Sequence, residues 1–344
     1  MKALEKLIKT NVLALQPYTS ARDEYQGSEG VFLDANESPY ELDYNRYPDP
    51  YQRVLKGKIA NWRSVDAGRI FLGNGSDEVI DLLIRASCEA GKDRILSLDP
   101  SYGMYKVSAA VNDIPIDLVA LNSDMSIHEE NLFSVMNDNH KLIFICSPNN
   151  PNGDTVSENI IEKVLNATNN IVIIDEAYID FSDSDSWIGR ISEYDNLVVL
   201  QTFSKSLGAA GIRLGMGFMN PYLVGILNKI KPPYNISTPN QEAAIQRLNN
   251  IDKIDDLVND IKRSIKVLKT ALEMLQIVEL VFPSSANFLL VRFQDYKKVF
   301  STLINHKIIV RDRSSNTNCE GCLRITIGTE SENQRLIEVL KTIK

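Results

Sequence analysis

The stretch 198-VVLQTFSKSLGAAGIRLGMGF-218 joins an apolar run to a lone lysine, a series of small residues and an arginine. Its apolar part is continuous and lacks the alternation of a half-exposed strand, which is typical of a strand buried on both faces of a parallel sheet. Lys205 follows this strand directly, and Arg213 lies eight residues further on. A lysine that is merely exposed to solvent would not need to follow a buried strand. The stretch therefore predicts a buried strand that ends at a reactive ammonium group.

Similar apolar runs recur along the chain and alternate with segments of helical periodicity, such as 76–90 and 157–168. Together with the run just described, the series is 70-IFLG, 94-RILSL, 115-PIDLV, 141-KLIFI, 171-IVII, 197-LVVLQ and 212-IRLGMGF. This alternation predicts an α/β fold with a mainly parallel seven-stranded sheet flanked by helices. We expect a large domain of this kind over residues 34–247.

The composition changes after 231-KPPYNISTPN. Apolar residues at helical spacing from Ile254 to Leu275 predict one long amphipathic helix. Strands are expected afterwards in 285-SANFLLVRF, 307-KIIVRDR and 322-CLRITIG. These elements predict a smaller C-terminal α+β domain over residues 248–344. Residues 1–33 are too few for a core of their own, and we expect an N-terminal arm that packs on the smaller domain or on a partner chain.

Composition excludes several classes of protein. The chain has 344 residues, 44% of them hydrophobic, and a formal net charge of −8, which argues against a nucleic-acid-binding surface. No apolar run has membrane-spanning length, and MKALEKLIKT lacks the apolar centre of a signal peptide, so we expect a cytoplasmic protein without a membrane partner. Cys319 and Cys322 form a C-x-x-C without a second pair or a nearby histidine, which favours two reduced thiols over a metal site.

Polar side chains follow several of the predicted strands at the point where each strand ends. In open parallel sheets, ligands bind beyond the carboxyl ends of the strands. The predicted topology therefore gathers one set of side chains along a single edge of the sheet, namely Ser76, Tyr102, Asn150, Asp175, Tyr178, Ser204 and Lys205.

Part of this set has the chemistry of an anion site. Gly75, Ser76 and Asp77 open a predicted helix, whose free N–H groups and positive dipole end suit a phosphate. Ser204 and Arg213 add a hydroxyl and a guanidinium that can bind the same anion.

The remaining residues fit a flat, charged ring. Tyr102 can stack on an aromatic ring, and Asp175 can pair with a protonated ring nitrogen. Lys205 can form a Schiff base with an aldehyde. Phosphate, aromatic ring, ring nitrogen and aldehyde together describe pyridoxal phosphate.

Motifs across almost the whole chain resemble the fold-type-I pyridoxal-phosphate aminotransferases, in particular 147-SPNNPNG, 175-DEAY and 202-TFSKSLGAAGIR. Four further motifs are similar to the histidinol-phosphate aminotransferase family of histidine biosynthesis: 33-LDANESPY, 45-NRYPDP, 101-SYGMYKVSA and 321-GCLRITIG. This resemblance implies a transaminase that interconverts histidinol phosphate and 2-oxoglutarate with imidazole-acetol phosphate and glutamate.

The resemblance also implies roles around the cofactor. Lys205 would bind the cofactor covalently and move the proton, and Asp175 would pair with the ring nitrogen. Tyr178 and Asn150 would hydrogen-bond the phenolic oxygen of the ring, and Tyr102 would stack on it. The family's usual Asn-Pro-Thr-Gly turn is 150-NPNG here. We expect the turn to survive, because asparagine tolerates turn conformations.

The substrate side is implied in the same way. Arg324, with Arg311 beside it, would bind the anionic group of either substrate, and Tyr18 and Asn36 would complete the substrate site. Tyr47 would reach across a homodimer to the cofactor phosphate of the neighbouring subunit.

Three alternatives remain open at this point. A decarboxylase of a phosphorylated amino acid or an aromatic amino acid aminotransferase would use the same cofactor residues. Asp175-Glu176 after an apolar strand also resembles the acidic pair of a nucleotide hydrolase. That function needs a G-x-x-x-x-G-K-[ST] loop, and the Gly-Lys pairs 57-GK and 91-GK lack its other residues.

Overall fold

The structure is a computed structural model that describes residues 2–17 and 30–343. Its larger sheet has seven strands in the order β1-β7-β6-β5-β4-β2-β3, and only β7 runs antiparallel to its neighbours. The predicted mainly parallel sheet is therefore confirmed. Its strands are β1 (Ile70–Asn74), β2 (Arg94–Asp99), β3 (Ile116–Ala120), β4 (His140–Cys146), β5 (Ile171–Asp175), β6 (Leu197–Thr202) and β7 (Leu214–Phe218).

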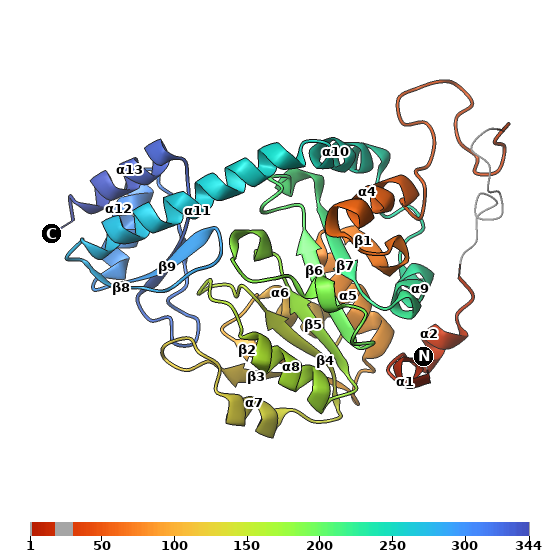
Figure 1. The fold of residues 1–344 in the computed structure, drawn as a ribbon, viewed down its shortest axis with the longest axis horizontal. Helices are drawn as coiled ribbons and strands as arrows, with labels where there is room; N and C mark the ends of the chain where they lie inside the picture. Colours follow the sequence, from red (N-terminus) through yellow and green to blue (C-terminus); the bar gives the residue numbers. More distant parts are fainter. Residues whose placement is uncertain (1, 18–29, 344) are drawn as a thin grey trace.

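Helices cover both faces of this sheet, which is why its strands read as continuous apolar runs (Figure 1). In β5, Ile171 and Ile173 face one core, while Val172 and Ile174 face the other. The first core includes α5 (Ser76–Ser87), α6 (Met104–Val111) and α9 (Pro221–Ile230). The second includes α4 (Arg53–Arg63), α7 (Glu129–Val135), α8 (Glu158–Ala167) and α10 (Thr238–Leu248). Short 3-10 helices span Ala67–Arg69, Ile179–Phe181, Trp187–Arg190 and Ala210–Ile212.

The N-terminal residues pack on the large sheet unit. Helices α1 (Lys2–Glu5) and α2 (Thr10–Ala14) lie beside α9, at the opposite end of the molecule from the C-terminal unit (Figure 1). Leu4, Leu7, Ile8 and Val12 are buried there, and the Lys9 amide donates to the carbonyl of Ala86 at 2.9 Å. For residues 2–14 this corrects the expectation that the arm joins the smaller domain. The reason is that these four apolar side chains are buried in the core that α5, α6 and α9 share.

The C-terminal unit has a four-stranded antiparallel sheet in the order β10-β11-β9-β8. Its strands are β8 (Val278–Val281), β9 (Phe288–Phe293), β10 (Arg311–Asp312) and β11 (Cys322–Thr326), and α12 (Tyr296–Asn305) and α13 (Glu330–Leu340) pack against them. Three of the strands were expected from the sequence. Strand β8 was not expected, because two of its four residues are exposed and the run is too short to show a period.

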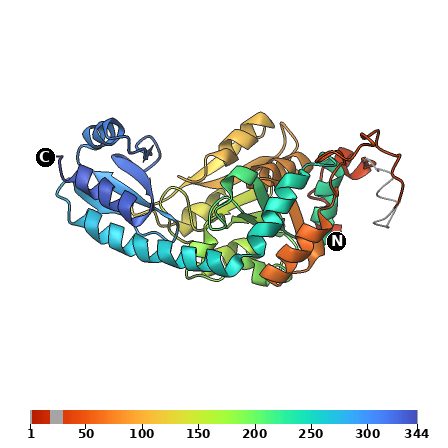
Figure 2. The ribbon, with the colours of Figure 1, turned by 90° about the horizontal axis from the view of Figure 1, so that it is seen from above.

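The long predicted helix is α11 (Ile251–Glu273), and it connects the two units (Figure 2). Ile254 and Val258 pack in the core of the large unit, whereas Ile265 and Leu268 pack in the core of the small one. The domain boundary at residue 248 stays a prediction. None of the helices in residues 2–17 and 30–343 is both long and apolar enough to cross a bilayer.

Candidate active site

A cavity of about 140 Å³ lies at the carboxyl ends of the parallel strands, where the sequence places the functional side chains. Its walls come from the ends of β1, β4, β5 and β6, from the loop after β2 and from the loop before β7. The predicted residues that line it are Gly75, Ser76, Asp77, Tyr102, Asp175, Tyr178, Ser204, Lys205 and Arg213. Residues far apart in the chain are thus brought to one place by the strand order.

One side of the cavity is an anion cradle. Helix α5 begins at Ser76, and its cap residue Gly75, with φ +74°, provides no side-chain acceptor for the first N–H groups. A Cβ on Gly75 would lie 2.6 Å from Nη2 of Arg213. The absence of a side chain therefore leaves the helix N-terminus open beside a guanidinium, and both favour a phosphate.

Asp175 forms the opposite wall of the cavity. Its side chain is buried, and it accepts hydrogen bonds from Tyr105 Oη at 2.6 Å and from the Ala177 amide at 3.1 Å. Burial raises the pKa of the Asp175 carboxyl above its ordinary value, while these two donors and nearby Lys205 act in the opposite direction. The arrangement supports a carboxylate that can pair with a protonated ring nitrogen.

Tyr105 is a site residue that the sequence analysis missed. It is fully buried, stacks on Phe144 with ring centroids 4.5 Å apart, and holds Asp175 through its hydroxyl. The rings of Tyr105 and Tyr102 pack edge to face, with their centroids 5.6 Å apart. Tyr102 Oη in turn donates to Asp77 Oδ1 at 3.0 Å. The sequence offers no signal for this role, because Tyr105 lies in the apolar pattern of α6 and looks like an ordinary core tyrosine.

Lys205 faces Tyr178 across the cavity, with Nζ 5.6 Å from the centroid of the tyrosine ring. Within the described part of the chain, no carboxylate lies within ion-pair distance of Nζ and no side chain accepts a hydrogen bond from it. Burial in the cavity, followed by the charge of Arg324, lowers the pKa of the Lys205 ammonium. A larger fraction of free amine is what a nucleophilic lysine requires.

A chain of polar contacts joins the small unit to this cavity. Asn150 Nδ2 donates to Tyr178 Oη at 3.4 Å, and Arg324 Nη1 donates to Asn150 Oδ1. Arg324 also lies over the ring of Phe288, which meets Tyr178 edge-on at 5.2 Å. Arg324 on β11 is thereby linked through Asn150 to Tyr178, which lines the cavity that contains Lys205.

The turn after β4 keeps its shape with Asn152 at the unusual position. The Gly153 amide donates to the carbonyl of Asn149 at 2.7 Å, and Gly153 has φ +82°. Asn149 Nδ2 donates to Oδ1 of Asn152 at 2.7 Å, so the asparagine side chain closes the turn. The turn therefore presents Asn150 to Tyr178 as expected.

Tyr47 and Asn36 lie in a different cavity, of about 390 Å³, together with Tyr234. Tyr47 stacks on Tyr234 with ring centroids 4.4 Å apart and is half exposed. Within one chain the structure does not bring these two residues to Lys205. Tyr18 lies outside the described residues.

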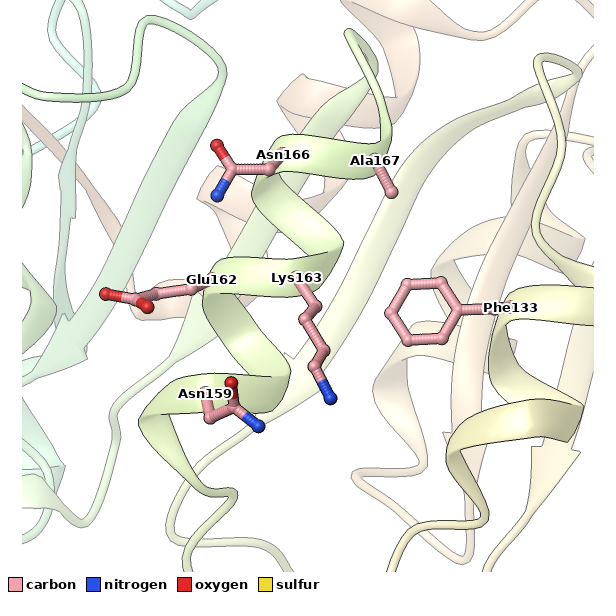
Figure 3. A pocket seen from close by; sticks show the side chains of 6 residues that line it. All are labelled: Phe133, Asn159, Glu162, Lys163, Asn166 and Ala167. Carbon is pink, nitrogen blue, oxygen red and sulfur yellow. The ribbon is translucent and has the colours of Figure 1, made fainter.

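A hollow of about 470 Å³ between α7 and α8 contains none of the predicted residues (Figure 3). Phe133 faces Lys163 and Ala167 across it, while the side chain of Glu162 points away. Lys163 is already paired with Glu129 at 2.7 Å. The hollow offers no arrangement comparable to that around Lys205.

Comparison with known proteins identifies the family. Residues 35–340 match the model for aminotransferase class I and II. A histidinol-phosphate aminotransferase of Cytophaga hutchinsonii is 49% identical over 344 residues, covering 99% of both chains. The chain belongs to the histidinol-phosphate aminotransferase family. It is a transaminase of class I and II, and such enzymes use pyridoxal phosphate.

Solved structures agree with this aminotransferase in fold. The histidinol-phosphate aminotransferase of Clostridium acetobutylicum superposes with a TM-score of 0.81 at 28% identity, covering 88% of this chain and 91% of that one. The enzyme of Sinorhizobium meliloti, in complex with pyridoxal-5'-phosphate, gives a TM-score of 0.79 at 23% identity, covering 88% of this chain and 85% of that one.

The cavity of this aminotransferase fits pyridoxal phosphate by its own chemistry. The open N-terminus of α5 beside Arg213 suits the phosphate, and buried Asp175 suits the ring nitrogen. Lys205, without a partner in the described residues, suits the aldehyde. Each of the three groups of the cofactor therefore has a matching group in the protein.

Proposed function

We propose that the protein transfers an amino group from histidinol phosphate to 2-oxoglutarate, or in reverse from glutamate to imidazole-acetol phosphate. The observation that carries this proposal is the position of Arg324, an arginine without a carboxylate partner in the described residues, which reaches the Lys205 cavity through Asn150 and Tyr178. Together with full-length similarity to histidinol-phosphate aminotransferases, it supports an anionic amine as the substrate.

Lys205 and Asp175 carry the central proton transfer in this proposal. When bound, pyridoxal phosphate supplies an aldehyde that takes up the amine and a ring that accepts the electron pair left behind by the proton. Lys205 Nζ would be the base that takes the proton from the substrate carbon and the acid that gives it back during the transfer. Asp175 would pair with the ring nitrogen and favour its protonated form, which would make the ring a better acceptor of electrons.

Tyr178 and Asn150 hold the oxygen side of the ring in the proposed complex. Tyr178 faces Lys205, and Asn150 is hydrogen-bonded to Tyr178, so both can serve as donors toward the phenolic oxygen. Donation to that oxygen stabilises its anion and tunes the reactivity of the bound aldehyde. Tyr102, which lines the cavity, would stack on the ring and shield it from water.

Arg324→Ala is expected to raise the Michaelis constants for both histidinol phosphate and glutamate. One guanidinium is proposed to bind the phosphate of the first substrate and the α-carboxylate of the second. Losing a charge-assisted bidentate contact costs about 2–4 kcal/mol of transition-state binding, read from kcat/KM for each substrate. A change confined to one substrate would contradict the shared site.

Tyr105→Phe is expected to lower turnover about tenfold, because it removes a hydrogen bond to a buried carboxylate. Loss of this donor raises the pKa of Asp175 further, so protonation of the carboxyl sets in at a higher pH. The acidic limb of the pH–rate profile should therefore move to higher pH. Tyr222→Phe on α9, outside the cavity, is the control, and a profile unchanged in Tyr105→Phe would refute the positioning role.

We also propose a homodimer with composite sites. Large apolar side chains on the segment before α4 are exposed in the single chain, including Val31 at 88%, Leu33 at 86% and Tyr40 at 75%. A second copy that covers this segment would bury them and bring Tyr47 to the neighbouring cofactor phosphate. The proposed compartment is the cytoplasm, which suits the four free cysteines.

Mixing two inactive variants should restore activity if Tyr47 serves the neighbouring subunit. Tyr47→Asp and Lys205→Ala place their defects in different sites of a mixed dimer, so one site carries both lesions and the other neither. Unfolding and refolding the two variants together should recover activity above the sum of the separate preparations. If mixed dimers form without any gain in activity, Tyr47 acts in its own subunit or not at all.

Product analysis separates the proposed reaction from its rivals. The purified protein is incubated with histidinol phosphate and 2-oxoglutarate, and glutamate and the keto product are quantified. A decarboxylase would release carbon dioxide from a phosphorylated amino acid, and it would form no glutamate. An aromatic aminotransferase would form glutamate from phenylalanine faster than from histidinol phosphate.

A further inference from the structure

Arg313 lies beside the two arginines already considered, Arg311 and Arg324. In the antiparallel pair β10–β11, Arg311 stands opposite Arg324. The ladder continues one step beyond β10, because the Arg313 amide donates to the carbonyl of Cys322 at 3.0 Å. Side chains two residues apart in an extended strand lie on the same face, and so do directly opposed residues. Arg311, Arg313 and Arg324 therefore occupy one face of the small sheet.

None of these three arginines has a carboxylate within ion-pair distance among the described residues. Arg63 and Arg94 do have one, at 2.8 Å from Asp180 and 2.5 Å from Asp117, whereas Arg69 and Arg292 donate to backbone carbonyls instead. In addition, Nε of Arg313 is buried without a hydrogen-bond partner. A buried donor without a partner is costly unless a ligand satisfies it.

Arg313 interacts electrostatically with Arg324, Arg311 and Tyr178. Burial, and then the charges of Arg324 and Arg311, lower the pKa of the Arg313 guanidinium, whereas Tyr178 acts in the opposite direction. Arg324 is affected by Arg311 in the same way. The three like charges thus repel one another, and a bound anion would relieve that repulsion.

We propose that Arg313 is a specificity-determining residue, a third guanidinium that binds the dianionic phosphate monoester of the substrate but is not needed for a carboxylate. This inference rests on the proposed function. A phosphate monoester presents three terminal oxygens and close to two negative charges at pH 7, because its second pKa is about 6. A carboxylate presents two oxygens and one charge, which Arg324 and Arg311 suffice to bind.

Arg313→Met keeps the length of the side chain and removes its charge. The Michaelis constant for histidinol phosphate should rise about tenfold, the loss expected for one charge-assisted contact, with kcat changed little. The constant for glutamate should change less than about threefold. Arg313→Lys should recover part of the affinity for the phosphate ester. Arg335→Met, at an arginine of the same unit that donates to the carbonyl of His306, is the matched control.

The pH dependence gives a readout that a purely structural role would not move. In the wild-type enzyme, affinity for histidinol phosphate should fall as pH decreases through the second phosphate pKa of about 6. In Arg313→Met this dependence should be flatter, because the group that distinguishes dianion from monoanion is gone. Equal effects on both substrates, no effect on either, or an unchanged pH dependence would each overturn the inference.

Binding of simple anions to the holoenzyme separates this inference from the proposed function. Propyl phosphate and butyrate are titrated calorimetrically into wild type and Arg313→Met. A weaker propyl phosphate affinity with unchanged butyrate affinity supports the role of Arg313 even if histidinol phosphate proves not to be the substrate. Equal affinities of the two proteins for propyl phosphate would overturn it, even if histidinol phosphate is turned over. Should Arg313→Met not fold, Arg313→Lys and Arg313→Gln carry the same comparison.

Discussion

Lys205→Ala is expected to lower transamination by about 10⁴-fold or more, because it removes both the covalent anchor of the cofactor and the base that moves the proton. The fold should persist, since Lys205 makes no ion pair or side-chain hydrogen bond in the described residues. The cofactor should still bind without a covalent bond, because the cradle of α5 and Arg213 remains. Turnover and equilibrium dialysis of the cofactor measure the two effects.

Borohydride reduction tests chemically whether Lys205 is the residue that binds the cofactor covalently. In the wild type, reduction should fix the cofactor on the peptide that contains Lys205, and the alanine variant should yield no fixed adduct. Lys163→Ala, at the hollow between α7 and α8, is the control and should behave as wild type. An adduct on any other lysine would disprove the assignment of Lys205.

Asp175→Asn should lower turnover by about 10²- to 10⁴-fold, with a smaller loss of cofactor affinity. The substitution keeps the size of the side chain and removes the charge that holds the ring nitrogen protonated, which costs several kcal/mol in the transition state, at about 1.4 kcal/mol per tenfold. The single carbonyl oxygen of the asparagine can accept from the Ala177 amide, and the Tyr105 hydroxyl can then accept from its NH2 group, so the side chain keeps its position. Single-turnover rates with saturating cofactor isolate the chemical step.

Glu176→Gln is the matched control for this experiment. Glu176 is the next residue, but it accepts from Ser186 Oγ, the Trp187 amide and Gln201 Nε2 and contributes nothing to the cavity wall. Burial raises its pKa to about 7, so the carboxyl is already partly neutral at neutral pH. Its neutral variant should keep turnover within about threefold of wild type. Near-normal turnover in Asp175→Asn would show that this carboxylate is not the partner of the ring nitrogen.

The sheet and most of the cavity could be predicted from sequence for one physical reason. Strands buried on both faces are apolar throughout, so their ends are marked by the first polar residues, and parallel strands bring those ends to one edge. Asp175 and Lys205 were found because each directly follows such a run. How deeply these two side chains are buried, and how far apart they lie, could be learned only from the structure.

The residues that sequence analysis missed act through side-chain geometry. Tyr105 lies inside an apolar helix pattern, and only its 2.6 Å bond to Asp175 distinguishes it from an ordinary core tyrosine. Arg313 is one of many charged residues in the sequence. Its place in the site follows only from the strand register, which sets Arg311 opposite Arg324. The packing of residues 2–14 on α9 was also missed, because an amphipathic segment does not reveal which apolar surface covers it.

In the proposed reaction, this cavity passes an amino group from histidinol phosphate to 2-oxoglutarate. The most direct measurement follows the absorption spectrum of the cofactor bound to purified protein. Histidinol phosphate alone should convert the spectrum from that of an aldehyde to that of an amine, and 2-oxoglutarate added afterwards should restore it, with one glutamate formed per site. A spectrum that does not change with histidinol phosphate, or that changes and is not restored by 2-oxoglutarate, would contradict the claim.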